Sequence, residues 1–490
     1  MATGAEARKK RVVSGMRPTG RLHIGHYFGA LQNWVRMQNA VLPASLPQQT
    51  SQAGAQHSLG SVRDKAAPLQ GQDPGKAGHG NAAPLRGEEQ RQEYECFYFI
   101  ADWHALTSDY ADTSAIAQNT IEIMTDYLAS GLDPKKSVIF QQSLVPEHAE
   151  LHLLLSMVTP LGWLERVPTY KEALENVRDK DLHTYGFLGY PTLQTADIVI
   201  YSSPAGAGAE GVQLFVPVGE DQVSHVELSR EIVRRFDLFY GFELDESLRS
   251  KSAAGLCGNF CLALKIPGNT LSMSDFPLDV EKWAEFGSRV RTRIIEIGFD
   301  NAIELLRAAA VADMVKFTRV LQEPEVKLTR TPRVPGLDGR KMSKSYGNAI
   351  TLSESDADIR AKTKVMVTDP ARKRRSDPGN PDICPVYDWH KLFSTRDTLE
   401  WAAEGCRTAG IGCIECKAKM ADHLIEWISP VRERRVEYEK HPKRVLEILE
   451  DGSKRARKVA QGTMERVREA VFGWEKKKKE IEGSAGSAKA

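Results

Sequence analysis

Residues 11–26 read RVVSGMRPTGRLHIGH, and the fold prediction is built outward from this segment. The first five residues have the apolar character of a short β-strand that stops at a glycine. Between Tyr27 and Arg36, apolar residues recur at helical spacing: Phe28, Leu31, Trp34 and Val35. A strand, a glycine-containing turn and a helix form the repeating unit of parallel α/β sheets, so the segment predicts the start of such a sheet.

Further strands and helices alternate along the chain. Residues 96–101, 137–141 and 213–218 are short apolar runs, and helices are predicted over 114–130 and, after Gly219-Glu220-Asp221, through about 236. Apolar strands that alternate with helices are typical of parallel sheets covered on both faces. The sequence therefore predicts an α/β fold with a Rossmann-like parallel sheet.

Three segments have the composition of disordered chain. Residues 1–10 and 39–93 are small and polar, and the second stretch contains no aromatic residue. Residues 476–490 begin with four lysines and continue in Gly, Ser and Ala. Such segments bury too little apolar surface to offset the entropy lost on ordering, so we expect all three to be disordered.

The remaining chain divides into two predicted domains. A catalytic domain over 11–352 is interrupted by 39–93 and by a second insertion, 241–322, of unknown role. Within the second insertion, residues 260–274 resemble a hairpin around Pro-Gly-Asn. A helical domain is predicted over 353–475.

The overall charge hides a local asymmetry. The chain has 66 Lys and Arg against 65 Asp and Glu, a formal charge of +1, which excludes a protein that is basic throughout. Residues 360–490 alone hold 29 Lys and Arg against 21 Asp and Glu. This excess predicts a surface that contacts nucleic-acid phosphates, although solvated helix faces with paired charges explain several of these stretches equally well.

The chain has no sign of export or of a membrane anchor. No apolar run approaches the roughly 18 residues of a membrane span, and residues 1–10 lack the apolar block of a signal peptide. Seven cysteines in a long chain of this kind indicate a reducing compartment. We therefore expect a cytoplasmic protein.

Polar residues follow three of the predicted strands. Arg17 to Gly20, Asp102 with His104, and Gly219 to Asp221 all stand where ligands bind parallel sheets. His23 and His26 begin the first helix, where free N–H groups attract phosphate, and both imidazoles can donate hydrogen bonds to developing negative charge. On spacing alone, a histidine pair that merely caps the helix is the simpler interpretation.

A second motif lies 315 residues further on, at Lys341-Met342-Ser343-Lys344-Ser345. A loop with two ammonium groups can close over a polyphosphate and stabilise the leaving group. By itself such a loop is more often solvated surface.

The two motifs together resemble the signatures of class I aminoacyl-tRNA synthetases. Other segments are similar to the bacterial tryptophanyl-tRNA synthetase family: GMRPTG at 15–20, LERVPTYK at 164–171, YP at 190–191, ADI at 196–198, GEDQ at 219–222 and GLDGR at 336–340. The resemblance covers about 11–37, 94–240 and 323–475. It implies activation of tryptophan with ATP and Mg²⁺, transfer to tRNA(Trp), and a homodimer whose helical C-terminal domain binds the anticodon.

The resemblance also implies the site residues. His23, His26, Lys341 and Lys344 would be catalytic. ATP would bind to Arg17, Pro18, Thr19, Gly25, His26, Gly219, Glu220, Asp221, Val334, Lys341, Met342, Ser343, Lys344 and Ser345. Tryptophan would bind to Asp197, Gly15, His104, Tyr190, Gln194, Val216, Val218 and Gln222.

The implied role of Asp197 has a physical reason. Indole offers one polar group, an N–H donor, and a buried carboxylate is a strong acceptor for it. On spacing alone Asp197 would be a carboxylate on a helix surface. Gln194 departs from the methionine of some relatives, which leaves that wall of the pocket less well defined.

Four late cysteines, Cys384, Cys406, Cys413 and Cys416, have the spacing C-x21-C-x6-C-x2-C. Four thiolates suit either zinc or an iron–sulfur cluster, and zinc ribbons usually show two close pairs rather than one. The surrounding segments resemble the subgroup of the family that holds a [4Fe–4S] cluster, so the cluster is the expected group, zinc the alternative, and free core cysteines a third possibility. Cys96, Cys257 and Cys261 are expected to be buried thiols.

Three functional alternatives stay open at this point. A tyrosyl-type synthetase is the nearest. A synthetase-like RNA-binding protein without catalysis is a second, although both histidines and both loop lysines are present. The third is a cofactor adenylyltransferase, a class that has no long helical C-terminal domain.

Overall fold

The structure, a computed structural model, describes residues 9–40, 93–176, 181–203, 211–266, 272–329 and 334–487. The disorder predicted for 1–10 and 39–93 falls almost wholly on residues outside these ranges. The same is true of the turn predicted at 267–269.

The central element is a five-stranded sheet in which every neighbouring pair is parallel. Its order is β3-β2-β1-β4-β7, and the strands are β1 (Lys10–Met16), β2 (Tyr94–Ile100), β3 (Ser137–Gln141), β4 (Gln213–Val218) and β7 (Glu325–Leu328). The strands predicted at 11–15, 96–101, 137–141 and 213–218 are confirmed. β7 was not predicted.

Helices connect these strands and cover the sheet. They are α1 (Ile24–His26), the π-helical turn Tyr27–Leu31, α2 (Gln32–Gln38), α3 (Asp102–Asp109), α4 (Ile116–Ala129), α5 (Glu147–Ser156), α6 (Leu161–Leu164), α7 (Pro168–Asn176), α8 (Tyr185–Leu188), α9 (Tyr190–Val199) and α10 (Val223–Tyr240). The helices predicted after β1, β2 and β4 are confirmed as α1–α2, α4 and α10. Within the described ranges, no helix has both the length and the hydropathy needed to cross a membrane.

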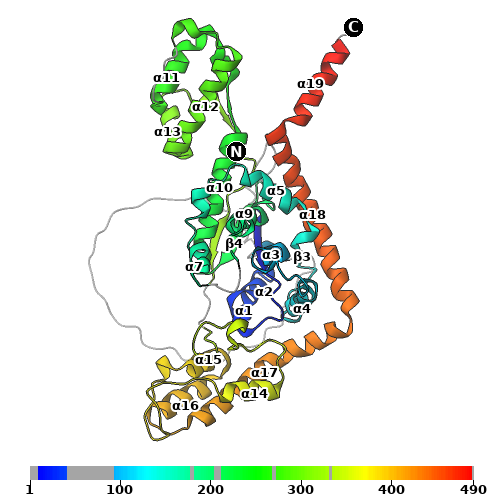
Figure 1. Cartoon of the computed structure of the whole chain (residues 1–490), viewed down its shortest axis with the longest axis vertical. Coiled ribbons are helices and arrows are strands. Elements are labelled where there is room, and N and C mark those ends of the chain that lie inside the picture. The colour runs from blue at the N-terminus through cyan, green and yellow to red at the C-terminus, as the bar shows by residue number, and fades with distance from the viewer. Residues whose placement is uncertain are drawn as a thin grey trace, which may run out of the picture.

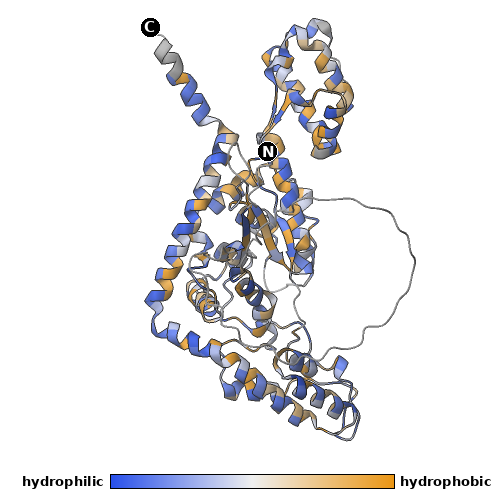
Figure 2. Ribbon diagram, turned by 180° about the vertical axis from the view of Figure 1, so that it is seen from behind, coloured by the Kyte–Doolittle hydropathy of each residue, from blue (hydrophilic) through white to orange (hydrophobic). Residues whose placement is uncertain are grey.

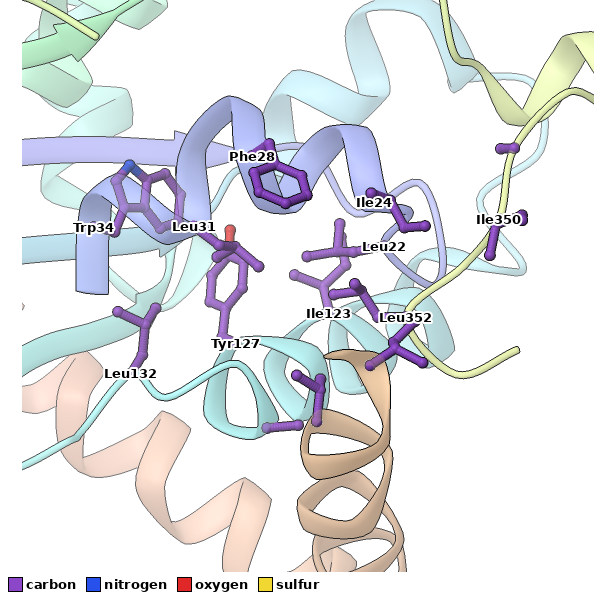
Figure 3. Close-up of a cluster of buried hydrophobic side chains, with 14 of the residues drawn as sticks. Leu22, Ile24, Phe28, Leu31, Trp34, Ile123, Tyr127, Leu132, Ile350 and Leu352 are labelled. Carbon is purple, nitrogen blue, oxygen red and sulfur yellow. The ribbon is translucent and has the colours of Figure 1, made fainter. Parts of the chain in front are cut away.

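The two faces of the sheet belong to two separate cores. Along β2, Tyr98 and Ile100 point into one buried cluster, and Phe97 and Phe99 point into the other. Because successive side chains of a strand point to opposite faces, this alternation shows that both faces are covered, as the apolar strands predict. Figure 3 shows part of the first cluster, where Leu22, Phe28 and Trp34 pack against Ile123 and Tyr127 of α4.

The C-terminal part of the chain is helical, as predicted. It contains α14 (Asp356–Lys364), α15 (Pro385–Phe393), α16 (Arg396–Arg407), α17 (Cys413–Lys440) and α18 (Pro442–Phe472). In Figure 1, α14 to α16 lie at one end of the molecule and α18 runs along its flank. The first buried cluster continues from the sheet into α15, α17 and α18, so the α/β part and the C-terminal helices share one core.

Helix α18 lies directly against the edge strand β3. A Cβ atom on Gly452 would stand 1.8 Å from the Ile139 carbonyl oxygen, so the helix backbone touches the strand at this position. The adjacent Ser453 Oγ accepts a hydrogen bond from the Gln141 N–H at 3.3 Å. The outward-facing backbone of β3 is therefore covered by a helix instead of another strand.

The insertion 241–322 folds around a core of its own. It consists of α11 (Ala254–Leu264), α12 (Val280–Ile297) and α13 (Phe299–Ala308) above a small antiparallel pair, β5 (Phe242–Leu244) with β6 (Val315–Phe317). Figures 1 and 2 show this lobe projecting beyond the sheet.

The hairpin predicted over 260–274 is wrong, because its first residues belong to α11. Its apolar residues Phe260, Cys261 and Leu264 are buried on the core side of that helix. The helix ends at Lys265, whose φ of 52° is left-handed. Such a C-terminal stop and a hairpin turn draw on the same residue types, which is why the pattern misled.

The disorder predicted for residues 476–490 is also wrong for the described part of this segment. Residues Trp474–Ser487 form α19, which is separated from α18 by Gly473 at φ 61°. Lys and Glu are good helix formers, and alternating charges support a helix without burial. Composition therefore indicated solvent exposure correctly, but disorder did not follow from it.

Gly452 and Gly462 of α18 offer a matched test of this packing. A Cβ on Gly462 would meet nothing within 4 Å, whereas a Cβ on Gly452 would meet backbone. We expect Gly452→Ala to destabilise the protein by about 1–3 kcal/mol and Gly462→Ala to stabilise it by about 0.5–1 kcal/mol. Thermal unfolding measures both, and equal shifts in melting temperature would contradict the packing of α18 on β3.

Candidate active site

Two cavities lie where the carboxyl ends of β1, β2 and β4 meet. These strands are neighbours in the sheet, so the polar segments that follow them come together as predicted. One cavity has a volume of about 510 Å³ and the other about 1270 Å³. Arg17 and Gly29 line both, so the cavities adjoin.

The smaller cavity is lined by every residue predicted to bind tryptophan. These are Gly15, His104, Tyr190, Gln194, Asp197, Val216, Val218 and Gln222. They come from β1, α3, α9, β4 and the turn after β4. Gly15 is required there, because a Cβ at that position would stand 2.7 Å from the ring of Phe99.

Asp197 is the polar centre of this cavity. Its carboxylate is 1% exposed and accepts hydrogen bonds from His104 Nε2, His148 Nδ1 and Gln142 Nε2, each at 2.7 Å. Burial alone would raise the pKa of Asp197, but the hydrogen bonds from His104 and His148 outweigh it and lower that pKa to about 2. The side chain is an anion at neutral pH and not the helix-surface carboxylate that spacing alone suggested.

A second polar group in the cavity is centred on Tyr190, seven residues before Asp197 in α9. The Tyr190 hydroxyl lies 2.5 Å from Thr169 Oγ1 and 2.9 Å from His225 Nε2. Thr169 belongs to the segment LERVPTYK, and His225 lies in the first turn of α10. Both residues line the cavity, and neither was predicted as a site residue.

Asp102, one of the polar residues at a strand end, lies outside both cavities. It accepts hydrogen bonds from Gln141 Nε2 at 2.7 Å and from the Ser143 N–H at 3.0 Å. Asp102 therefore ties the end of β2 to the end of β3.

The larger cavity contains most of the residues predicted to bind ATP. They are Arg17, Pro18, Thr19, Gly25, His26, Val334, Lys341, Met342, Ser343 and Lys344, and His23 lies among them. Gly219 lines the smaller cavity instead, and Glu220 and Asp221 line neither. The side chain of Ser345 lies outside what the structure describes.

His23 and His26 form a reciprocal cap on α1. Each Nδ1 accepts the other residue's backbone N–H at 3.3 Å, and the rings stack with centroids 3.6 Å apart. Burial, aided by Lys344, lowers the pKa of His23 to about 4 and that of His26 to about 3, so both are neutral near pH 7. A neutral imidazole whose Nδ1 accepts carries its proton on Nε2. The capping interpretation is therefore correct for Nδ1, while each Nε2–H stays available as a donor.

The lysine loop already contacts the histidine segment. Lys344 Nζ donates to the Thr19 carbonyl at 2.5 Å and to the Arg21 carbonyl at 2.9 Å, and burial lowers the pKa of this lysine. The buried side chain of Asn348 holds the loop by three hydrogen bonds. It accepts the Ser343 N–H at 2.8 Å and donates to the Lys341 carbonyl at 3.1 Å and to Asp338 Oδ1 at 2.7 Å.

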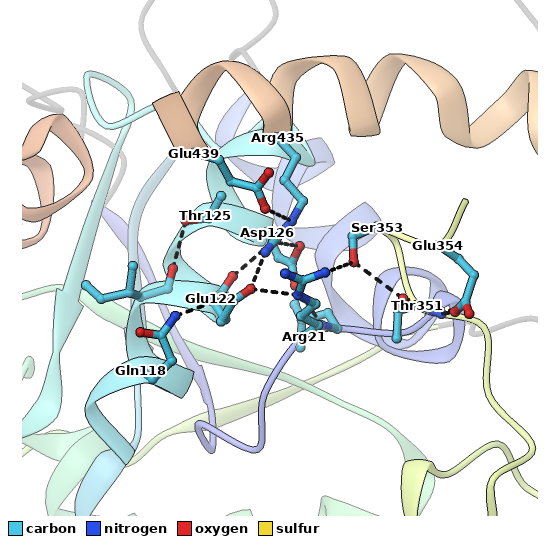
Figure 4. A network of polar contacts seen from close by, with 12 residues as sticks. Arg21, Gln118, Glu122, Thr125, Asp126, Thr351, Ser353, Glu354, Arg435 and Glu439 are labelled. Atoms are coloured by element: carbon cyan, nitrogen blue, oxygen red, sulfur yellow. Dashed lines mark hydrogen bonds and ion pairs between the residues drawn. The ribbon is translucent and has the colours of Figure 1, made fainter. Parts of the chain in front are cut away.

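A buried charge cluster supports the histidine segment from the other side (Figure 4). Asp126 of α4 accepts the Leu22 N–H at 2.6 Å and pairs with Arg435 of α17, which also pairs with Glu122. Burial raises the pKa of Asp126 to about 6, although Arg435 and the Leu22 N–H act to lower it. Helix α17 is thus linked through Asp126 to Leu22, the residue that precedes His23.

The four late cysteines are brought together by three helices. Cys384 precedes α15, Cys406 lies in the last turn of α16, and Cys413 and Cys416 lie in the first turn of α17. Burial and, to a smaller extent, the other three thiols together raise the pKa of Cys416 to about 12. Within the described ranges, no three His, Cys, Asp or Glu side chains are close enough to hold one metal ion. Cys96, Cys257 and Cys261 are buried thiols, as predicted.

Sequence reasoning missed five site residues: Gln142, His148, Thr169, His225 and Asn348. A signal existed for the first two. They follow β3, whose carboxyl end meets the same sheet edge as the three strand ends that were considered. Asn348 and His225 had no signal in the sequence, because their roles depend on contacts between distant segments.

The sequence matches the family described as tRNA synthetases class I (W and Y) over residues 5–45, 82–260 and 291–429. It is 42% identical to the tryptophan–tRNA ligase of Ralstonia nicotianae, with 94% of this chain and 98% of that protein covered. It is 38% identical to the tryptophan–tRNA ligase of Thermotoga maritima over the same shares of the two chains.

A solved structure agrees in fold. The tryptophanyl-tRNA synthetase from Campylobacter jejuni complexed with ADP and tryptophan superposes with a TM-score of 0.58 at 24% identity. It covers 94% of this chain and 99% of its own.

Asn348 gives a test of the lysine loop. Asn348→Ala removes three hydrogen bonds that hold the loop, so we expect kcat for ATP–pyrophosphate exchange to fall by about 10- to 100-fold. Asn301→Ala is the matched control, because Asn301 is exposed on α13 and its amide donates to the Ile297 carbonyl one turn away. An unchanged kcat for Asn348→Ala would show that the loop needs no such fastening.

Proposed function

The chain belongs to the tRNA synthetases class I (W and Y), and from that membership we propose which residues carry out each step of its reaction. It is an aminoacyl-tRNA ligase for tryptophan. It activates L-tryptophan with ATP to give tryptophanyl-AMP and pyrophosphate, and then transfers the tryptophanyl group to tRNA(Trp). The observation that supports the residue assignment is the adjoining pair of cavities, one centred on Asp197 and the other on two neutral histidines and the lysine loop.

We assign ATP to the larger cavity. The carboxylate of tryptophan attacks the α-phosphorus, and the bond to pyrophosphate breaks. His23 and His26 donate hydrogen bonds from Nε2 as charge develops, while Lys341 and Lys344 hold the leaving pyrophosphate. Arg17 lines both cavities and is placed to contact the reacting groups. Mg²⁺ would neutralise phosphate charge, bound by the phosphates and water instead of a protein cage.

Arg17, Pro18, Thr19, Gly25, Val334, Met342 and Ser343 complete the proposed ATP site. Gly219, Glu220, Asp221 and Ser345 are proposed as further nucleotide contacts. The loop 341–345 contacts residues 19–21 through Lys344, which supports its assignment to the same site as the histidine segment.

We assign tryptophan to the smaller cavity, with Asp197 as acceptor of the indole N–H. The carboxylate is ionised and accepts only, which suits a donor with no acceptor of its own. A phenol must both donate and accept, so a tyrosyl-type enzyme fits this wall less well. Gly15, Val216 and Val218 supply apolar surface, and His104, Tyr190, Gln194 and Gln222 supply the polar rim.

We propose that residues 11–352, apart from the insertions, form the catalytic domain and that 353–475 bind the anticodon. The basic excess over 360–490 supports tRNA contact. A homodimer in the cytoplasm is the proposed form, as the resemblance to the family implies.

We further propose that Cys384, Cys406, Cys413 and Cys416 hold a [4Fe–4S] cluster. The donor set is four thiols from three helix ends, which suits iron or zinc. Arg372 Nη1 lies 3.8 Å from Cys406 Sγ and would offset the charge of bound thiolates. The backbone of Gly379 packs closely against Cys406, since a Cβ there would stand 2.6 Å from that sulfur. The group would hold α15, α16 and α17 together.

The activity is tested by ATP–pyrophosphate exchange. Purified protein should exchange label with tryptophan and show little exchange with tyrosine or without amino acid. Asp197→Asn should lower kcat/KM for tryptophan on the order of 100-fold, while Asp245→Asn, a surface cap in the insertion, should leave it unchanged. Exchange with tyrosine in place of tryptophan would overturn the substrate, and no exchange at all would favour a non-catalytic RNA-binding protein.

The cysteine group is tested by metal analysis of protein purified without oxygen. We expect about four iron and four sulfide per chain, in line with a [4Fe–4S] cluster, with loss of both in Cys416→Ser. Cys96→Ser is the control, because Cys96 lies in the core of β2 away from the other thiols. One zinc per chain and no iron would rule out the cluster.

A further inference from the structure

Asp197 depends on residues behind the cavity wall. Two of its three donors, Gln142 and His148, come from the segment that follows β3. His148 lies in α5 and is completely buried. Neither imidazole nitrogen of His148 faces solvent or the cavity, so its function is exerted through its neighbours.

The hydrogen bonds of His148 fix their own direction. Its Nδ1 lies 2.7 Å from Asp197 Oδ1, and its Nε2 lies 2.7 Å from the Tyr201 hydroxyl. A carboxylate only accepts, so Nδ1 carries the proton and donates. In a neutral ring, Nε2 then accepts from the Tyr201 O–H. Burial raises the pKa of Tyr201 well above its usual value, which keeps that phenol protonated.

The ring of His148 cannot turn away from Asp197. The rings of Phe99 and Phe140 each lie with centroids 6.1 Å away, and the ring of Tyr201 lies 5.5 Å away. Together with Gln142, His148 saturates Oδ1 of Asp197. The other oxygen, Oδ2, is bonded to His104, a residue of the cavity wall.

These contacts give the two oxygens different roles. Oδ1 is held by fixed donors in the core, and Oδ2 is the oxygen on the ligand's side. A carboxylate held in this way cannot rotate to offer a different acceptor geometry, and it keeps its charge although it is buried.

We propose that Tyr201, His148 and Gln142 are positioning residues that hold Asp197 so that Oδ2 reads the indole N–H, and that this relay sets the selectivity for tryptophan. The inference rests on the proposed assignment of tryptophan to this cavity. It concerns residues that touch no substrate, and it predicts a change in discrimination in addition to any loss of rate.

The experiment compares tryptophan with 3-benzothienyl-L-alanine, in which sulfur replaces the ring N–H in an otherwise similar shape. ATP–pyrophosphate exchange gives kcat/KM for each, and their ratio measures the reading of the N–H. In His148→Leu, which removes both hydrogen bonds, we expect this ratio to fall by about 10-fold or more, through a raised KM for tryptophan. The side-chain amide of His148→Asn can still donate to Asp197, so we expect its ratio to lie between the ratios of His148→Leu and the wild type.

Tyr201→Phe is the milder variant and keeps the test decisive if His148→Leu does not fold. It removes only the O–H that His148 accepts, so we expect a fall in the ratio of about 3- to 10-fold. Tyr98→Phe is its matched control, because Tyr98 is equally buried but donates to the Trp34 carbonyl on the other face of the sheet.

The outcomes separate cleanly. A fall of kcat/KM by the same factor for both substrates, or an unchanged ratio in Tyr201→Phe and His148→Asn alike, would overturn the relay. A wild-type protein with no tryptophan-dependent exchange would instead overturn the assignment on which the relay rests.

Discussion

The pairing of Asp126 with Arg435 matters most to this fold, because it compensates a fully buried carboxylate and joins distant parts of the chain. Asp126 is fully buried, and an unpaired carboxylate at that depth would be strongly destabilising. Its two oxygens are satisfied by parts of the chain that lie 104 and 309 residues away, the Leu22 N–H and the Arg435 guanidinium. The position of the histidine segment is therefore set jointly by α4 and by the C-terminal helix α17, and neither part of the chain can move without disturbing the other.

This arrangement explains why the two cavities are separate but adjoining. The histidine segment is held by Asp126 through the Leu22 N–H and by Lys344 through the Thr19 carbonyl, with His23 buried and His26 partly exposed. The Asp197 cavity is organised by a different set of contacts, from α3, α5 and α9. Among the described residues, Arg17 and Gly29 are the two that line both cavities. Under the proposed assignment, each substrate binds beside its own polar group, and the reacting atoms meet where the two cavities adjoin.

Apolar periodicity and strand-end position are local signals, and from them the sequence was sufficient for four of the five described strands of the sheet and for α2, α4 and α10. The sequence also indicated the eight lining residues of the smaller cavity, through its resemblance to the synthetase family. It was insufficient for residues whose partners are distant. Nothing near Asn348 indicates that it fastens a lysine loop, and nothing near Arg435 indicates Asp126. Turn residues such as Pro, Gly and Asn are as common after a helix as in a hairpin, and the packing of Phe260 and Leu264 decides in favour of α11.

The cover that α18 gives to β3 has a consequence for synthesis of the protein. Gln141 and Ser453, which meet at this edge, are 312 residues apart in the chain. At about 5–20 residues per second, β3 leaves the ribosome some 16–60 s before its cover is made. During that interval the sheet carries an open edge whose unpaired N–H and C=O groups can pair with another nascent chain. We therefore expect the protein to need a chaperone most during this interval, when β3 has been made and α18 has not.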